Sequence, residues 1–384
     1  MLYSEFRHRN ECEKVSGVAR LKLKVLLFCL LLAPLHQGAA QSEAGIHKHY
    51  FYHNLGYGSD ALMNPLSLLI NSGFGVLQVE GRSRKLSEID YAVGCKNVAW
   101  NVLSPIASIR VYGVGDFLAN EVIPFSLGRK HGQFWPNYQN HLIGGGMSYR
   151  AMAEWYETHG FAYPRTLAAV TVMATHFLNE IVENNNYVGR TVDPIADLYI
   201  FDPAGILLFS SESVSSFFAE TLHLADWSYQ PAYNPRSRTI ENMGQNYSIK
   251  YKLRASGRLS IFYYFGMSGI LGLSYEFRRG ESFSLGMGLR AKGIVRLDEK
   301  SDALLETATL TWNAGFFYDR NNSLLFSILS SGVNNYRVIA NVYPGLISLG
   351  RFSPGIFAAL SADNKIVMGF NVLYFPLGVA TNFR

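Results

Sequence analysis

Apolar and polar residues alternate along the C-terminal third of the chain, from about residue 247 onward. In residues 271–278, leucine, tyrosine and phenylalanine hold the odd positions, while glycine, serine, glutamate and arginine hold the even ones. Successive side chains of a strand point to opposite faces, so this period of two predicts strands with one apolar and one polar face. Short runs of turn residues separate these segments. We expect strands at residues 247–254, 259–265, 271–278, 283–290, 307–316, 324–329, 336–343 and 366–375.

About eight strands of this kind are typical of a small transmembrane β-barrel, although a soluble sandwich or lipocalin-like barrel shows the same alternation. The polar face favours the membrane, because it is rich in glycine, serine, threonine, arginine and lysine, as a wet lumen requires. Aromatic residues such as Tyr263-Tyr264 stand at strand ends, where interfacial girdles belong. Phe383 is next to last, similar to the C-terminal aromatic signal of outer-membrane barrels, although Arg384 follows it. We therefore predict an outer-membrane barrel over residues 247–384.

Upstream of the predicted barrel, apolar residues recur at helical spacing, most clearly in residues 142–159, 165–184 and 206–224. The polar segment 228–246 contains two prolines, which interrupt helices, and is expected to be a linker. The predicted fold class is therefore α+β. A helix-rich region over residues 41–227, acting as plug, periplasmic cap or partner-binding part, precedes the antiparallel transmembrane β-barrel.

The N-terminal residues are typical of an exported protein. Residues 25–35 form an apolar run after three basic residues, too short to span a bilayer and typical of a signal peptide cut near Ala40. Removal of residues 1–40 leaves 28 basic and 26 acidic side chains, so no nucleic-acid partner is expected. Cys95 is then the single cysteine, which excludes an intramolecular disulfide and a cysteine-based metal site.

The ionisable side chains with most potential for chemistry lie upstream of the predicted strands. On a helix, His176, Glu180 and Glu183 are spaced by four and three residues, so they share one face of an otherwise apolar segment. Imidazole and carboxylate groups on one face can bind a divalent metal or act as an acid–base pair. The catalytic candidates are His141, His176, Glu180, Asp193 and Asp197. The further binding candidates are Asn137, Tyr138, Glu183 and Asp202.

A structural role is open for the same residues. A buried charge must be paired, and Arg150, Arg165 or Arg190 can pair with them where the helices meet the barrel. The spacing also lacks the second histidine of an H-E-x-x-H zinc site. We therefore expect no cofactor, and a divalent metal at His176 and Glu180 is the alternative.

Glycine and proline residues beside these positions predict local geometry. The glycine triplet 144–146 lacks the Lys-Ser/Thr of a phosphate loop, so it is expected to allow close approach of elements or a turn with positive φ. Asp193 and Asp202 are each followed by proline. Each pair predicts a helix start, with aspartate as N-cap and proline as the first helical residue.

The order of these motifs resembles an uncharacterised family of bacterial outer-membrane β-barrel proteins. The resemblance consists of N-Y-x-x-H from Asn137, a glycine-rich turn, N-E at Asn179, D-P-x-x-D from Asp193 and P-x-G from Pro203. It covers residues 137–205, under a fifth of the chain. No biochemical activity comes with that family, so the resemblance implies a location, the outer membrane of a Gram-negative cell, more than a function.

The sequence favours a non-enzymatic envelope protein with a scaffold or partner-binding role, whose partners are outer-membrane lipid and other envelope proteins. A barrel of about eight strands is filled by side chains, which argues against a porin. The alternative is a membrane-embedded lipid-modifying or metal-dependent hydrolase, which requires the histidine and carboxylate candidates to converge. A second alternative is a transporter of a hydrophobic compound, which a continuous apolar pocket between helices and barrel would favour.

Overall fold

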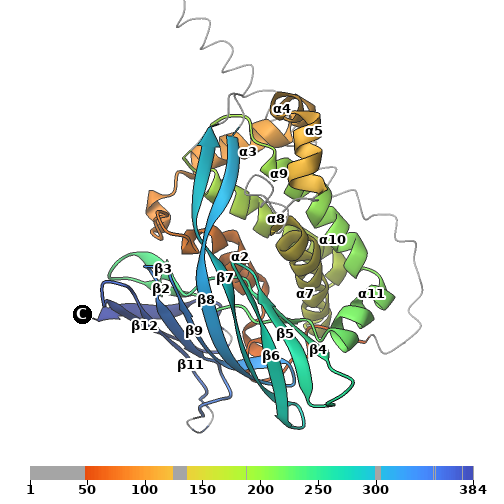
Figure 1. Cartoon of the computed structure of the whole chain (residues 1–384), viewed down its shortest axis with the longest axis vertical. Coiled ribbons are helices and arrows are strands. Elements are labelled where there is room, and N and C mark those ends of the chain that lie inside the picture. The colour runs from red at the N-terminus through yellow and green to blue at the C-terminus, as the bar shows by residue number, and fades with distance from the viewer. Residues whose placement is uncertain are drawn as a thin grey trace, which may run out of the picture.

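The computed structural model describes residues 48–123, 136–186, 188–298, 304–348, 350, 352–373 and 375–383. Over these residues a helical region precedes a large mixed sheet, and the helices gather on one side of it (Figure 1). The predicted signal peptide, residues 1–40, lies outside the described residues. None of the described helices combines the length and the apolarity that crossing a membrane requires.

Thirteen strands form one sheet over the described residues. Their bounds are β1 Ala225–Asp226, β2 Ala232–Asn234, β3 Thr239–Glu241, β4 Tyr247–Lys252, β5 Leu259–Phe265, β6 Ser268–Arg278, β7 Glu281–Asp298, β8 Leu304–Arg320, β9 Ser323–Ser331, β10 Val338–Val342, β11 Gly355–Leu360, β12 Ile366–Asn371 and β13 Gly378–Phe383. The spatial order is β1, then β4 to β13 in sequence, then β2 and β3. Neighbours are antiparallel except β13 and β2, which pair in parallel.

The predicted barrel of about eight strands is corrected by this topology. The outermost strands of the order, β1 and β3, do not pair with each other, so over the described residues the sheet is not closed into a barrel. Eight strands match predicted segments, whereas β1, β2, β3, β11 and β13 were not predicted. The segment 228–246, expected to be a linker, contributes β2 and β3. Strands of three residues are too short for a period of two to reveal them.

The two faces of the sheet differ as the alternation predicts. Leu271 pairs with Met287 on one face, where Met287 is 72% exposed. On the opposite face Ser274 and Ser284 are buried, and the Ser284 hydroxyl donates to Ser274 Oγ at 2.9 Å. The predicted alternation is therefore confirmed for residues 271–278 and 283–290, whereas the buried face of the sheet also carries large apolar side chains such as Phe262, Ile270 and Phe317. The exposed members on β6, β7 and β8, here called the apolar sheet face, are Leu271, Leu273, Tyr275, Phe283, Leu285, Met287, Leu289, Leu310 and Trp312.

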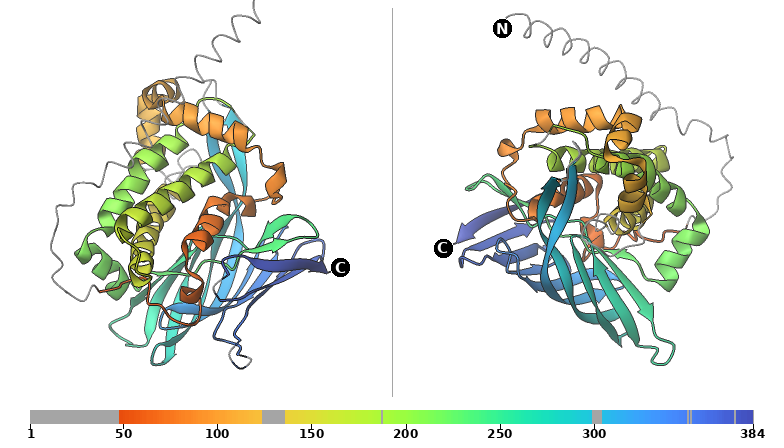
Figure 2. Two further views of the ribbon diagram at one scale, coloured as in Figure 1. Left: turned by 180° about the vertical axis from the view of Figure 1, so that it is seen from behind. Right: turned by 45° about the horizontal axis from the view of Figure 1, so that its top comes forward.

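The helical region forms a layer beside the sheet (Figure 2), and side chains of α7 and α10 pack against Tyr247 and Phe265 of β4 and β5. Its α-helices are α2 Pro65–Gly73, α3 Tyr91–Val102, α4 Pro105–Tyr112, α5 Val114–Phe117, α7 Gly146–Thr158, α8 Pro164–Glu183, α9 Asp193–Ala196, α10 Asp202–Phe209 and α11 Glu212–Ser216. Its 3₁₀ turns are η1 Asp60–Leu62, η2 Gly75–Gln78 and η3 Leu86–Glu88, and its π-helical turns are η4 Leu118–Val122, η6 Asn137–Gly145, η7 Asp197–Phe201 and η8 Phe217–Thr221. The three predicted helical stretches all fall on these elements.

Two hydrogen bonds join the helical layer to the sheet at separate places. On one side, the Tyr247 hydroxyl of β4 lies 2.8 Å from Ser148 Oγ of α7, and both side chains are buried. On the other, Arg290 of β7 donates to Gln78 Oε1 at 3.1 Å. β7 and β8 are the longest strands and rise beyond their neighbours beside the helices (Figure 1).

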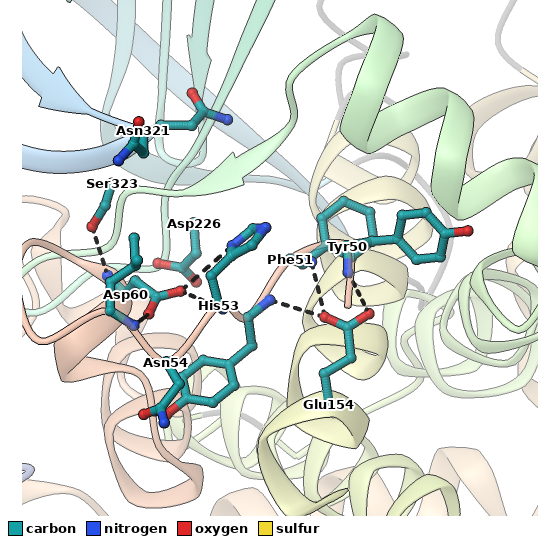
Figure 3. A network of polar contacts seen from close by, with 12 residues as sticks. Tyr50, Phe51, His53, Asn54, Asp60, Glu154, Asp226, Asn321 and Ser323 are labelled. Carbon is teal, nitrogen blue, oxygen red and sulfur yellow. Dashed lines mark hydrogen bonds and ion pairs between the residues drawn. The ribbon is translucent and has the colours of Figure 1, made fainter. Parts of the chain in front are cut away.

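The segment of residues 50–60, here called the strap, links α7 to β9 (Figure 3). The backbone N–H groups of residues 50–52 donate to the Glu154 carboxylate of α7 at 2.8–2.9 Å. Further along, the Asp60 carboxylate accepts the N–H groups of His53 and Leu55 at 2.9 and 2.7 Å. The Asp60 N–H donates to Ser323 Oγ at 3.2 Å. The buried carboxylates of Glu154 and Asp60 thus accept hydrogen bonds from backbone N–H groups of residues 50–55, which lie in no helix or strand.

Candidate functional site

The catalytic candidates of the sequence and Asp202 converge at one place in the helical layer. They come from three segments: η6, α8, and the helical run that α9, η7 and α10 form over residues 193–209. Segments so far apart in the chain meet because each buries its apolar residues in the same layer. The converging residues, here called the His–carboxylate cluster, are His141, His176, Glu180, Asp193, Asp197 and Asp202.

The first half of the cluster is built around Asp202. Its Oδ1 atom lies 2.9 Å from His141 Nδ1 and 2.5 Å from His176 Nδ1. The two imidazole rings meet edge to face, with centroids 4.7 Å apart. His176 and Asp202 are buried. One donor atom from each of the three residues lies within 4.8 Å of the others.

The second half consists of carboxylates. Glu180, Asp193 and Asp197 also place one oxygen each within 4.8 Å of one another. His141 joins the two halves, because its Nε2 lies 3.2 Å from Asp197 Oδ2. His176 and Glu180, expected from their helical spacing to act as one pair, therefore contribute to adjoining halves of the cluster.

The environment favours the charged forms of Asp202 and His141 in the first half and the neutral forms of Glu180 and Asp197 in the second. Burial alone would raise the pKa of Asp202, but the imidazoles of His176 and His141 outweigh it and lower that pKa to about 2. Burial would lower the pKa of His141, and Asp202 reverses this and raises it. The pKa values of Glu180 and Asp197 are well above those of ordinary carboxyls, because both groups are buried and repelled by neighbouring carboxylates such as Asp193. The first half thus favours charge, and the second half carries charge only at a cost.

A helix starts at Asp193 as predicted, but the N-cap role expected of Asp193 and Asp202 is corrected. α9 begins at Asp193 itself, and no side-chain bond caps it. Asp202 lies inside a continuous helical run, since Phe201 before it is also helical. Pro203 has no N–H to donate to the preceding turn, and the wider π-helical turn η7 stands directly upstream. Asp202 is therefore free to serve the two imidazoles rather than the helix terminus.

Glycines allow the three segments to approach. A Cβ atom on Gly145 would lie 2.8 Å from His176 Cε1, and one on Gly205 would lie 2.7 Å from the Leu142 carbonyl oxygen. Gly145 has a helical φ of −62°. Of the two roles expected for the glycine triplet, close approach is confirmed, and a turn with positive φ at Gly145 is wrong.

Replacing Gly145 with alanine is expected to lower the free energy of unfolding by about 1–3 kcal/mol, because the new methyl group overlaps the imidazole of His176. Gly115→Ala is the matched control, since Gly115 is also helical and a Cβ there meets nothing within 4 Å. Equilibrium urea unfolding measures the free energy of unfolding of both variants. Equal stability of the two variants would contradict the packing of Gly145 against His176.

The remaining predicted residues have other surroundings. Asn137 Nδ2 donates to the Glu121 carbonyl oxygen at 3.1 Å, and the Tyr138 hydroxyl donates to Val122 O at 2.8 Å, so both anchor η6 to η4. Glu183 lies at the edge of a cavity next to the cluster. Of the arginines expected to pair with the cluster, Arg150 binds Glu154 and Glu212, Arg165 lies 3.6 Å from Glu212, and Arg190 donates to Ser108.

The cavity beside the cluster has a volume of about 580 Å³. Its polar end includes His141, His176 and Asp197. Its other wall comes from β4 to β8 and the turn before β6, a contribution that sequence spacing gave no means to predict. The apolar and aromatic residues of that wall are Tyr247, Tyr263, Met267, Leu289, Ala291, Ile294, Ala308 and Leu310. Leu289 and Leu310 also belong to the apolar sheet face, so the cavity joins the cluster to that surface.

No family model, no curated protein and no solved structure matches the chain. The resemblance over residues 137–205 therefore stays a prediction. The functional argument rests on the geometry of the cluster and of the cavity.

Proposed function

We propose that this protein is an outer-membrane hydrolase that acts on a lipid-like amphiphile. The observation that carries the proposal is the convergence of the His–carboxylate cluster at the polar end of a cavity whose other wall is apolar. An amphiphile matches such a cavity, with its polar head at the cluster and its chain along β7 and β8. The volume falls within the range of about 300–1,000 Å³ that small-molecule sites occupy.

The membrane location is supported by the apolar sheet face. Soluble proteins rarely expose a continuous apolar patch larger than a few hundred Å². Here three adjacent strands present leucine, methionine and aromatic side chains outward, and Leu285 is 64% exposed. Unpaired strand edges are costly in hydrocarbon, so the proposal requires β1 and β3 to be paired or to lie outside it, as closure into a barrel would achieve.

The reaction proposed is ester hydrolysis. Water adds its oxygen to the acyl or phosphoryl group of the ester, the bond from that group to the alcohol oxygen breaks, and an acid and an alcohol leave. One proton of the water must reach the departing alkoxide, and the imidazoles and carboxylates at the polar end of the cavity can carry it. A purely structural scaffold needs no cavity beside these groups, which is why hydrolysis is preferred here.

A transporter of a hydrophobic compound is the second candidate, because the apolar wall of the cavity is continuous with the apolar sheet face. A hydrolase releases cleaved lipid, whereas a transporter leaves the lipid chemically unchanged. Incubation of the purified protein with lipid extracted from Gram-negative outer membranes, followed by mass spectrometry, should give hydrolysed lipid. Lipid that is bound but chemically unchanged would contradict hydrolysis and favour transport.

Introducing a charge on the apolar sheet face tests the membrane location separately. Met287→Arg is expected to destabilise the protein in lipid vesicles by about 2–4 kcal/mol, because Met287 would face hydrocarbon. Val111→Arg in α4 is the control, since Val111 is also exposed but belongs to the helical layer. Recovery of the wild-type protein in a soluble periplasmic fraction, or equal stability of both variants in vesicles, would contradict the location.

A further inference from the structure

The His–carboxylate cluster holds more negative than positive charge in a buried place. Glu180, Asp197 and Asp202 are 1–3% exposed, and Asp193 is half-buried. The carboxylates nearest to Glu180 repel it, and His141 is the group that opposes them. Buried charges of one sign persist only when protons or cations compensate them. The two histidines can neutralise at most half of the four carboxylates.

Two carboxylate oxygens in the cluster have acceptor capacity to spare. Asp197 Oδ1 and Asp202 Oδ2 are buried and accept no hydrogen bond from any of the described residues. A buried carboxylate oxygen without a donor costs free energy, so its presence needs a cause. Coordination of a cation is one such cause. The spare oxygens lie one in each half of the cluster, which indicates more than one cation.

The donor set matches a divalent transition metal. Ligand bonds of about 2.0–2.2 Å place the donor atoms of one ion within about 4.4 Å of each other. In each half the three donors already lie within 4.8 Å, so shifts of a few tenths of an ångström would bring them into range. Imidazole nitrogen with carboxylate oxygen suits ions such as Zn²⁺ and Mn²⁺.

We propose that the cluster is a two-ion metal centre, with one divalent ion held by His141, His176 and Asp202 and a second held by Glu180, Asp193 and Asp197. Two divalent ions carry the four positive charges that balance the four carboxylates. His141 Nε2, 3.2 Å from Asp197, links the two sites. Ion binding stands on this geometry alone, whereas the catalytic use of the ions rests on the proposed hydrolase function.

The ions give the proposed reaction its nucleophile. A divalent ion lowers the pKa of bound water to about 7, so hydroxide forms near neutral pH and the proton leaves to solvent. The hydroxide oxygen adds to the acyl or phosphoryl group, and the bond to the alcohol breaks. The departing alkoxide takes a proton from solvent or from the cluster. A second ion close by stabilises the oxygen that carries the negative charge.

Metal content tests the proposal directly. The full mature chain in detergent, stripped with EDTA and then equilibrated with Zn²⁺, is expected to retain two ions per chain by inductively coupled plasma mass spectrometry. His176→Ala should weaken binding at the first site by more than about 100-fold, because loss of a direct ligand exceeds the effect of losing a supporting residue. Asp197→Asn should do the same at the second site. His159→Ala is the control, because His159 is exposed and stacks on Trp155 away from the cluster.

The outcomes separate the metal centre from the hydrolase. Retention of less than one ion by the wild type, or equal content in wild type and His176→Ala, would overturn the centre and indicate carboxylates neutralised by protons. One ion that both variants lose would overturn its two-site form. Co²⁺ absorption of the wild type, expected to show nitrogen and oxygen ligation, gives a readout that survives if a variant fails to fold. Bound metal without lipid hydrolysis would leave the centre intact and refute the hydrolase, whereas hydrolysis that EDTA does not reduce would support the hydrolase and refute the catalytic use of the ions.

Discussion

Replacing Glu154 with alanine is expected to lower the free energy of unfolding by about 3–5 kcal/mol, the range for breaking a buried charged pair. The Glu154 carboxylate is 2% exposed and accepts three successive N–H groups of the strap at 2.8–2.9 Å (Figure 3). It also accepts Arg150 Nε at 2.9 Å. Alanine would leave these donors buried without an acceptor and an arginine charge with one partner fewer.

Glu157→Ala on the same helix is the matched control. Its carboxylate is 40% exposed and lies 3.4 Å from His49 Nε2, a surface contact worth less than about 1 kcal/mol. Urea unfolding in detergent, followed by tryptophan fluorescence, compares the two variants with the wild type. A loss of under 1 kcal/mol for Glu154→Ala would show that the strap does not hold α7.

Replacing Glu180 with glutamine should abolish most hydrolysis and at the same time stabilise the metal-free protein. A reduction of activity by about 10²–10⁴-fold is expected for a group that carries a proton or holds the charge of the centre. Stability should rise because Glu180 is buried beside Asp193 and Asp197, and a neutral amide removes their mutual repulsion. The measurements are lipid hydrolysis by mass spectrometry and urea unfolding in EDTA.

The same variant distinguishes a catalytic cluster from a purely structural one. If the cluster existed to hold the helices together, Glu180→Gln would weaken a pairing and destabilise the fold. Asp116→Asn, an exposed carboxylate on α5, controls for the loss of one negative charge and should change neither quantity. Reduced stability with unchanged hydrolysis would contradict the functional reading.

The sequence predicted the alternation of apolar and polar residues in the sheet better than the number and length of its strands. Alternation placed β6 and β7 and told which of their faces is apolar, because a period of two depends only on neighbouring residues. It underestimated the length of β7, which pairs with β8 as far as Asp298. It missed β2, whose parallel pairing with β13 joins the middle of the chain to its end, a contact that leaves no local pattern.

The sequence predicted which side chains come together in the cluster but not how they pair with one another. Helical spacing identified His176 and Glu180, and motif order added His141 and Asp197, all of which converge. Asp202 is both a binding candidate and an expected helix cap in the sequence, and the structure shows it between the two imidazoles and not at a helix cap. Which side chains pair across η6, α8 and α10 depends on how the helices cross. The cavity could not be predicted either, since its apolar wall comes from the sheet.

The central claim is that water cleaves an ester bound beside the His–carboxylate cluster. Hydrolysis of outer-membrane lipid in vesicles made up in H₂¹⁸O tests it, with the products analysed by mass spectrometry. The wild type is expected to release an acid that carries one ¹⁸O atom, and Glu180→Gln is expected to release almost none. Unlabelled product, absence of product, or equal labelled product from both proteins would contradict the claim.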